Sequence, residues 1–158
     1  MAPRILVAGL GNIFLGDDGF GSEVARRLAR RSWPAGVTIG DFGVRAYDLQ
    51  LALQAGHDAA ILVDITCRGG PPGTLYWIDP NVAAGAPPVA FDPHAMDPGR
   101  VLALVANIGT LPRLRVLACE PARIADDAFG LPLSEPVEQA IPVALTMIEK
   151  LLMEWLDA

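Results

Sequence analysis

The sequence has little positive charge, few cysteines and no long apolar run. Its 158 residues hold 12 lysines and arginines against 18 aspartates and glutamates, a net charge of −6, so it lacks the basic footprint of a nucleic-acid-binding protein. Two cysteines, Cys67 and Cys119, are too few for a disulfide framework. No apolar run reaches the roughly 18 residues of a membrane helix, and no signal peptide is visible. These absences predict a reduced, cytoplasmic chain with neither nucleic acid nor membrane as a partner.

The hydrophobic content is high enough for a substantial core. At 52% hydrophobic residues, we expect residues 1–158 to form one domain. Short apolar runs alternate with amphipathic stretches, which predicts an α/β fold: a three-layer α/β/α sandwich around a twisted, mostly parallel sheet of about five strands. We expect strands from near Arg4 and over 37–42, 59–63, 74–78 (an edge) and 114–118, with 59–63 central. We expect helices over 18–32, 46–54, from Asp97 to before Gly109, and over 134–156, the last bent or delayed at Pro142.

The most informative stretch covers residues 5–21. An apolar run begins at Ile5 and is interrupted by Gly9 and Gly11, after which Asp17 and Asp18 precede a helical pattern. The two glycines predict a sharp backbone turn between strand and helix. The loop therefore lies at the carboxyl end of a parallel strand, where open sheets place their functional sites.

Other polar residues end strands or follow them closely, and parallel strand ends share one edge of the sheet. Asp64 is the most telling, because it follows a fully apolar strand and an unpaired buried carboxylate costs several kcal/mol. It therefore needs an arginine, a cluster of backbone N–H groups or a metal ion. His94, in an irregular loop, could add a neutral nitrogen, and two carboxylates with one imidazole suit a borderline divalent ion. The polar residues at strand ends are Asp17, Asp18, Asp41, Asp64, Cys119 and Glu120.

Each of these residues also has a structural interpretation. Asp17 or Asp18 could cap the helix, Asp64 could pair with Arg45 or Arg68, and His94 could be an ordinary loop histidine. His57 is interpreted as structural or solvated, and Cys119 as a small buried hydrophobe. A solvated helix face is expected from Arg26, Arg27, Arg30 and Arg31.

The glycine pattern has two competing interpretations. Gly9 and Gly11 suggest a dinucleotide-binding loop, but Phe14 occupies the third glycine position. The run from Gly9 to Asn12 also opens the peptidyl-tRNA hydrolases, which continue with proline and glycine. Here Ile13 and Phe14 follow instead.

The ordered motifs resemble the hydrogenase maturation proteases, which process the large subunit of nickel–iron hydrogenases. The likeness covers nearly the whole chain. It rests on Gly9-Leu-Gly-Asn-Ile-Phe-Leu-Gly-Asp-Asp-Gly-Phe-Gly21, Asp41-Phe-Gly-Val-Arg45, Ile61-Leu-Val-Asp64, Pro72-Gly-Thr-Leu75, Asp92-Pro-His94 and Cys119-Glu-Pro121.

This resemblance implies an aspartic-type endopeptidase that removes a short C-terminal extension from the precursor large subunit once nickel has been inserted. The family's metal-contacting positions would fall on Asp18, Asp64 and His94, with the nickel carried by the substrate. Many relatives have glutamate at the first of these positions, so Asp18 is a shorter ligand. The chain is expected to be a monomer.

The resemblance leaves the finer roles open. Asp17 and Asp41 are the candidates for the general base, and Asp41, Gly43 and Arg45 are the candidates for substrate recognition. Two other functional classes also stay open: a non-catalytic nickel-binding chaperone, and a nucleotide- or small-molecule-binding α/β protein that uses the glycine loop.

Overall fold

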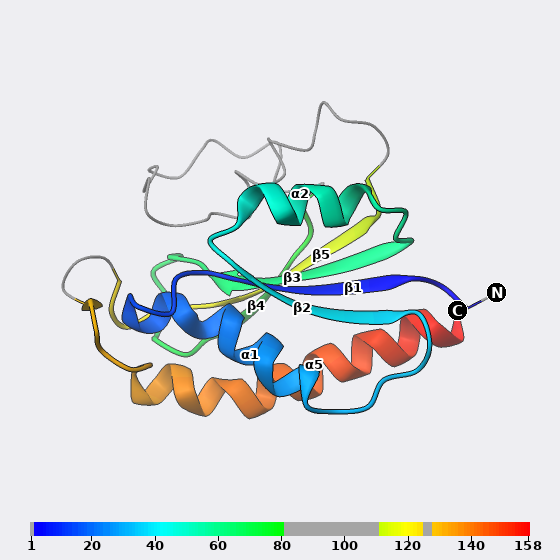
Figure 1. Ribbon diagram of the computed structural model, residues 1–158. Coiled ribbons are helices and arrows are strands. Elements are labelled where there is room, and N and C mark those ends of the chain that lie inside the picture. Colours follow the sequence, from blue (N-terminus) through cyan, green and yellow to red (C-terminus); the bar gives the residue numbers. More distant parts are fainter. Residues whose placement is uncertain (1, 81–110, 125–127) are drawn as a thin grey trace.

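The computed structural model describes residues 2–80, 111–124 and 128–158. They contain one five-stranded sheet with the strand order β2-β1-β3-β5-β4 (Figure 1). The strands are β1 (Ile5–Leu10), β2 (Val37–Gly43), β3 (Ala59–Ile65), β4 (Leu75–Ile78) and β5 (Arg113–Cys119). The helices are the short 3-10 helix η1 (Gly16–Gly19), α1 (Phe20–Ala29), α2 (Ala46–Gln54) and α5 (Glu135–Asp157).

The sheet is mostly parallel, as predicted. β1 pairs in parallel with β2 and β3, and β3 with β5, whereas β4 is an edge strand antiparallel to β5. All seven residues of β3 are buried. This burial on both faces explains the uninterrupted apolar run, and the predicted central position of this strand is confirmed.

Helices cover both faces of the sheet, so the predicted three layers are confirmed. α1 and α5 lie on one face and α2 lies on the other (Figure 1). Phe20 and Leu28 of α1 pack with Ile141 of α5 in the first core, and Leu49 and Leu53 of α2 belong to the second. The side chains of β3 alternate between the two cores because successive strand residues point to opposite faces.

The predicted first helix, 18–32, is wrong at both ends. Asp18 belongs to η1, and α1 begins only at Phe20. At the other end, the Trp33 indole N–H donates to the Leu28 carbonyl at 2.8 Å. This bond occupies one of the last helical carbonyls, and the chain turns away after Ala29.

Three further expectations need correction. β3 continues to Ile65, so Asp64 lies within the strand. Pro142 does not delay the last helix, which starts at Glu135. The arginines of α1 are not simply solvated, because Arg27 bridges to Glu138 of α5 at 2.6 Å. The predicted helix after Asp97 lies outside the described residues, and so do residues 81–93 of the long irregular loop that the sequence predicts over 79–93.

Candidate active site

The loop between β1 and η1 is held by a close backbone approach at Gly11. Its φ is +121°, and an added Cβ would lie 1.9 Å from the Asp18 carbonyl oxygen. The turn predicted at Gly11 is confirmed. Gly9 has another role. A Cβ added at Gly9 would lie 2.2 Å from the Gly21 carbonyl oxygen, so the missing side chain lets α1 pack closely against β1. Gly9 does not itself form the turn.

Asp18 is 4% exposed at the carboxyl end of β1. Its Oδ2 accepts a hydrogen bond from the Asn12 backbone N–H at 2.9 Å. The Asn12 side chain in turn accepts from the Phe14 N–H at 2.9 Å. Neither η1 nor α1 has a side-chain cap, so the alternative that Asp17 or Asp18 merely caps a helix is wrong.

Asp64 is 1% exposed and is the last residue but one of β3. Its Oδ1 accepts from the Ile65 N–H at 2.8 Å. η1, which carries Asp18, contacts β3, so the fold brings these two buried carboxylates to the same end of the sheet. The arginines considered for Asp64 have other partners: Arg45 bonds Asp48 at 3.3 Å, and the Arg68 guanidinium lies over the Tyr76 ring.

Asp17 joins three segments of the chain. Its fully buried carboxylate accepts from the backbone N–H groups of Ala122, Arg123 and Ser134 at 2.8, 3.0 and 2.7 Å, and from the Ser134 hydroxyl at 2.9 Å. It thereby ties η1 to the chain after β5 and to the start of α5. These four donors occupy both carboxylate oxygens, so the contacts of Asp17 favour a positioning role over that of a base.

Glu120 is an anchor whose role the sequence did not reveal. Its carboxylate accepts from the backbone N–H groups of Arg68, at 3.0 and 2.9 Å, and Gly70, at 2.7 Å. It thus fixes the loop between β3 and β4 to the end of β5. The available signal was a carboxylate directly after a buried strand, which demands nearby donors.

Cys119 has no role as a nucleophile at neutral pH. It is fully buried, and burial, followed by the charges of Asp17 and Glu120, raises the pKa of its thiol to about 12. The thiol therefore stays protonated, and the predicted small buried hydrophobe is confirmed.

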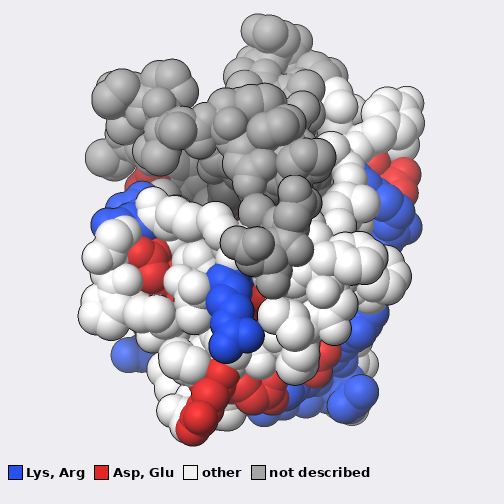
Figure 2. Space-filling view, turned by 90° about the vertical axis from the view of Figure 1, so that its left-hand side faces the viewer, with Lys and Arg blue, Asp and Glu red and all other residues white. Residues whose placement is uncertain are grey.

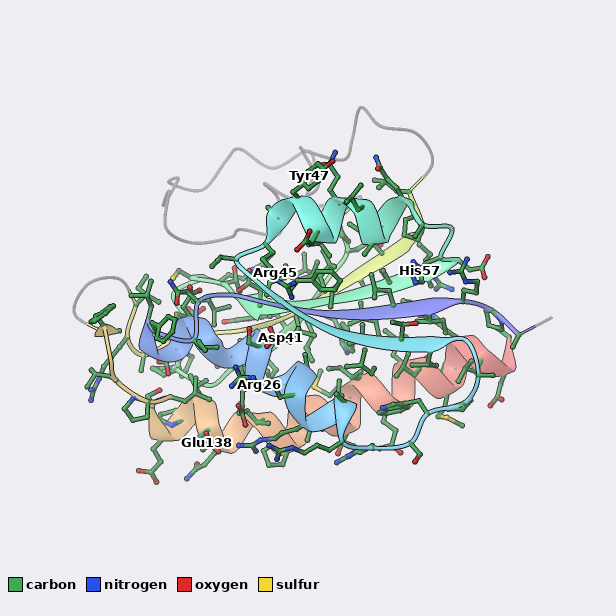
Figure 3. All side chains as sticks on the ribbon, viewed as in Figure 1. Arg26, Asp41, Arg45, Tyr47, His57 and Glu138 are labelled. Atoms are coloured by element: carbon green, nitrogen blue, oxygen red, sulfur yellow. The ribbon has the colours of Figure 1, made fainter. Side chains whose placement is uncertain are left out.

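The candidate recognition residues lie on and after β2. Arg45 donates to the carbonyls of Asp41 and Phe42 at 2.5 and 3.2 Å, and the Asp41 carboxylate lies 3.4 Å from the Arg26 guanidinium (Figure 3). Gly43 has a φ of +56° and accepts from the Gly11 N–H at 3.0 Å. These contacts connect the end of β2 to the glycine loop.

His94 lies outside the described residues, so the structure does not place the third residue of the predicted trio. Among residues 2–80, 111–124 and 128–158, no three histidine, cysteine or acidic side chains gather as a metal site.

His57 is at the opposite end of the sheet (Figure 3), where its Nδ1 lies 2.9 Å from the Ala52 carbonyl. This contact supports its predicted structural role.

Comparison with known proteins decides the family. Residues 22–151 match the family described as hydrogenase maturation protease. The chain belongs to this family. It is a peptidase, and the competing peptidyl-tRNA hydrolase and nucleotide-binding interpretations are excluded.

No helix in the described part of the chain is long and apolar enough to cross a membrane.

Individual relatives agree with this assignment. The hydrogenase expression/formation protein HupD of Rhizobium leguminosarum is 32% identical over 98% of this chain and 76% of its own length. A putative hydrogenase maturation protease of Methanocaldococcus jannaschii is 30% identical over 91% of this chain and 93% of its own. The hydrogenase maturating endopeptidase HybD of Escherichia coli superposes with a TM-score of 0.79 and 27% identity, covering 96% and 93% of the two chains.

Proposed function

We propose that this peptidase removes the C-terminal extension from the precursor large subunit of a nickel–iron hydrogenase after nickel has been inserted. The observation that carries the proposal is the pair of buried carboxylates, Asp18 and Asp64, on contacting elements at the carboxyl end of the sheet. Membership of the hydrogenase maturation proteases indicates the class of substrate, a hydrogenase precursor. The carboxylate pair offers ligands for the nickel that this substrate carries.

In this proposal Asp18, Asp64 and His94 contact the nickel that the substrate carries. Carboxylate oxygens and an imidazole nitrogen are suitable ligands for such an ion. Backbone N–H groups orient both carboxylates, at 2.9 Å for Asp18 and 2.8 Å for Asp64, as outer partners commonly do for metal ligands. A metal near the scissile bond can polarise its carbonyl or activate a water.

Asp41 is the better candidate for the general base. Its side chain is 31% exposed and its Oδ2 pairs with Arg26 at 3.4 Å. Its Oδ1 is buried and accepts no hydrogen bond in the described part of the chain, so this oxygen is left to take a proton. Asp17, by contrast, is fully buried and accepts four hydrogen bonds. We therefore assign Asp41 to proton transfer or to substrate contact, and Gly43 and Arg45 to substrate contact. Asp17 is assigned to positioning.

Incubation with nickel-loaded and nickel-free precursor tests the function. Mass spectrometry should detect release of the C-terminal extension from the nickel-loaded precursor alone. His94→Ala and Asp64→Asn should abolish the release. His57→Ala is the matched control, because the only other histidine in the sequence lies at the far end of the sheet (Figure 3). Nickel binding without any shortening of the precursor would instead indicate a chaperone.

A further inference from the structure

The loops beside Asp18 carry exposed apolar side chains that the fold does not need for its core. Phe14 is 63% exposed and Phe129 is 72% exposed, and Ile13 and Leu131 are 42% and 37% exposed. We call these four residues the apolar rim. Single exposed apolar residues are common on protein surfaces, but these four come from two loops that meet.

Backbone contacts hold the two loops together. Leu15 and Phe129 form an antiparallel bridge, and the Gly130 N–H donates to the Phe14 carbonyl at 2.8 Å. The Asn12 side chain fixes the Phe14 N–H at 2.9 Å. The rim is therefore ordered before it binds anything, which reduces the entropy lost on association.

The rim also borders the candidate active site. Ile13 and Phe14 lie between Asn12, whose N–H bonds Asp18, and η1, which carries that residue. At the base of the rim, Asp17 ties η1 to Ala122 and Ser134 on either side of the Phe129 loop. Uncharged surface makes up much of the described part of this end of the molecule (Figure 2).

We propose that the apolar rim docks the precursor large subunit, through apolar residues of that protein next to its cleavage site; this rests on the proposed function. The position beside Asp18 selects this occupant, because Ile13 and Phe14 directly follow Asn12, whose N–H bonds the Asp18 carboxylate. A second copy of the chain seated on the rim would cover the loop next to η1, which carries Asp18. Aromatic side chains, phenylalanine among them, are also enriched in protein interfaces.

The double variant Phe14→Ser/Phe129→Ser tests the rim, with Val143→Ser/Met153→Ser as the matched control. The control removes two apolar side chains of α5 that are 54% and 45% exposed. Biolayer interferometry with nickel-loaded precursor should show Kd raised about tenfold or more by the rim variant and unchanged by the control. In cleavage assays the rim variant should raise KM and retain kcat, because docking is lost and the carboxylates are not touched.

Equal Kd values for the wild-type protein and the rim variant would overturn the proposal, as would a wild-type protein that fails to bind the precursor. Binding without cleavage would refute the proposed function, and the comparison of Kd values would still decide the rim. Sedimentation analysis adds one more outcome. A wild-type dimer that the rim variant converts to a monomer would identify the rim as a self-association face and contradict docking of the precursor.

Discussion

At the scale of single residues, the candidate site depends on the close approach of the Gly11 backbone to the Asp18 carbonyl oxygen. We expect Gly11→Ala, and more so Gly11→Val, to destabilise the protein and to remove cleavage, because the added Cβ would lie 1.9 Å from the Asp18 carbonyl oxygen. Gly69→Ala is the matched control: its φ of +81° imposes similar strain, but nothing lies within 4 Å of the added Cβ. Strain alone costs about 1–3 kcal/mol.

Urea unfolding should therefore show Gly11→Ala losing at least about 2 kcal/mol more than Gly69→Ala, the additional cost of the clash. Equal losses for the two variants would show that the close approach is not important.

The Asp17 carboxylate should contribute more to the free energy of unfolding than an exposed carboxylate does. Asp17→Asn places an amide NH₂ among four donors, so at least one hydrogen bond is lost inside the protein. We expect a loss of about 2–4 kcal/mol in the free energy of unfolding, because buried hydrogen bonds to a charge are strong. The control is Asp48→Asn in the exposed pair with Arg45, where the change should stay within about 0.5 kcal/mol.

Chemical denaturation at neutral pH measures both variants. An Asp17→Asn protein as stable as the wild type would remove the basis for a positioning role.

The buried Cys119 thiol should give the protein an alkaline sensitivity. Its pKa is about 12 in the folded chain against 9.0 for the ordinary thiol, so the unfolded chain loses its proton first. The contribution to stability is complete below about pH 9 and is lost as the pH rises toward 12. Cys119→Ala should flatten the fall in melting temperature above pH 9.

Thiol labelling gives an independent check at neutral pH. Cys67 is exposed and Cys119 is buried, so an excess of a thiol reagent should label one cysteine in the native chain and both in denaturant. Rapid labelling of two thiols in the native protein would contradict the burial of Cys119.

At the scale of elements, α5 tolerates a proline well inside its length. Pro142 cannot donate to the Glu138 carbonyl, and the Pro142 carbonyl accepts from the Thr146 hydroxyl at 3.2 Å. Restoring the donor with Pro142→Ala should raise the free energy of unfolding by about 1 kcal/mol or more. Thermal and urea unfolding measure the gain.

Pro136 provides the control for this helix. It lies in the first turn of α5, where the missing N–H has no intrahelical partner and the fixed φ is favourable. Pro136→Ala should therefore leave stability unchanged or lower it slightly. A gain at Pro136 as large as that at Pro142 would refute the explanation.

At the scale of the whole molecule, stability should decrease from the centre of the sheet to the β4 edge. β3 is buried along its whole length and pairs on both sides, whereas β4 has one partner and no buried residue. Hydrogen exchange followed by mass spectrometry should show the amides of β3 as the most slowly exchanging and those of β4 as much faster. Similar protection in the two strands would contradict this order.

The sequence by itself determined the order of the strands and α-helices in residues 2–80, 111–124 and 128–158. Apolar runs such as 59–63 predict buried strands, because only a strand covered on both faces is apolar at every position. Phe20, Val24 and Leu28 recur every four residues and so predict one apolar face of a helix, and the edge strand expected over 74–78 is β4. The motifs from Gly9 to Gly21 and around Asp64 were sufficient to indicate the family.

Tertiary structure decided what each polar residue near the sheet edge does. Asp17 and Asp18 are adjacent in sequence, yet Asp17 bonds Ser134, 117 residues away, and Asp18 bonds Asn12 in its own loop. No local pattern distinguishes them, because the partners that satisfy a buried carboxylate come from segments that only the fold brings together. The same reason separates Gly9 from Gly11: one meets a helix and the other its own loop, and a sequence records neither neighbour.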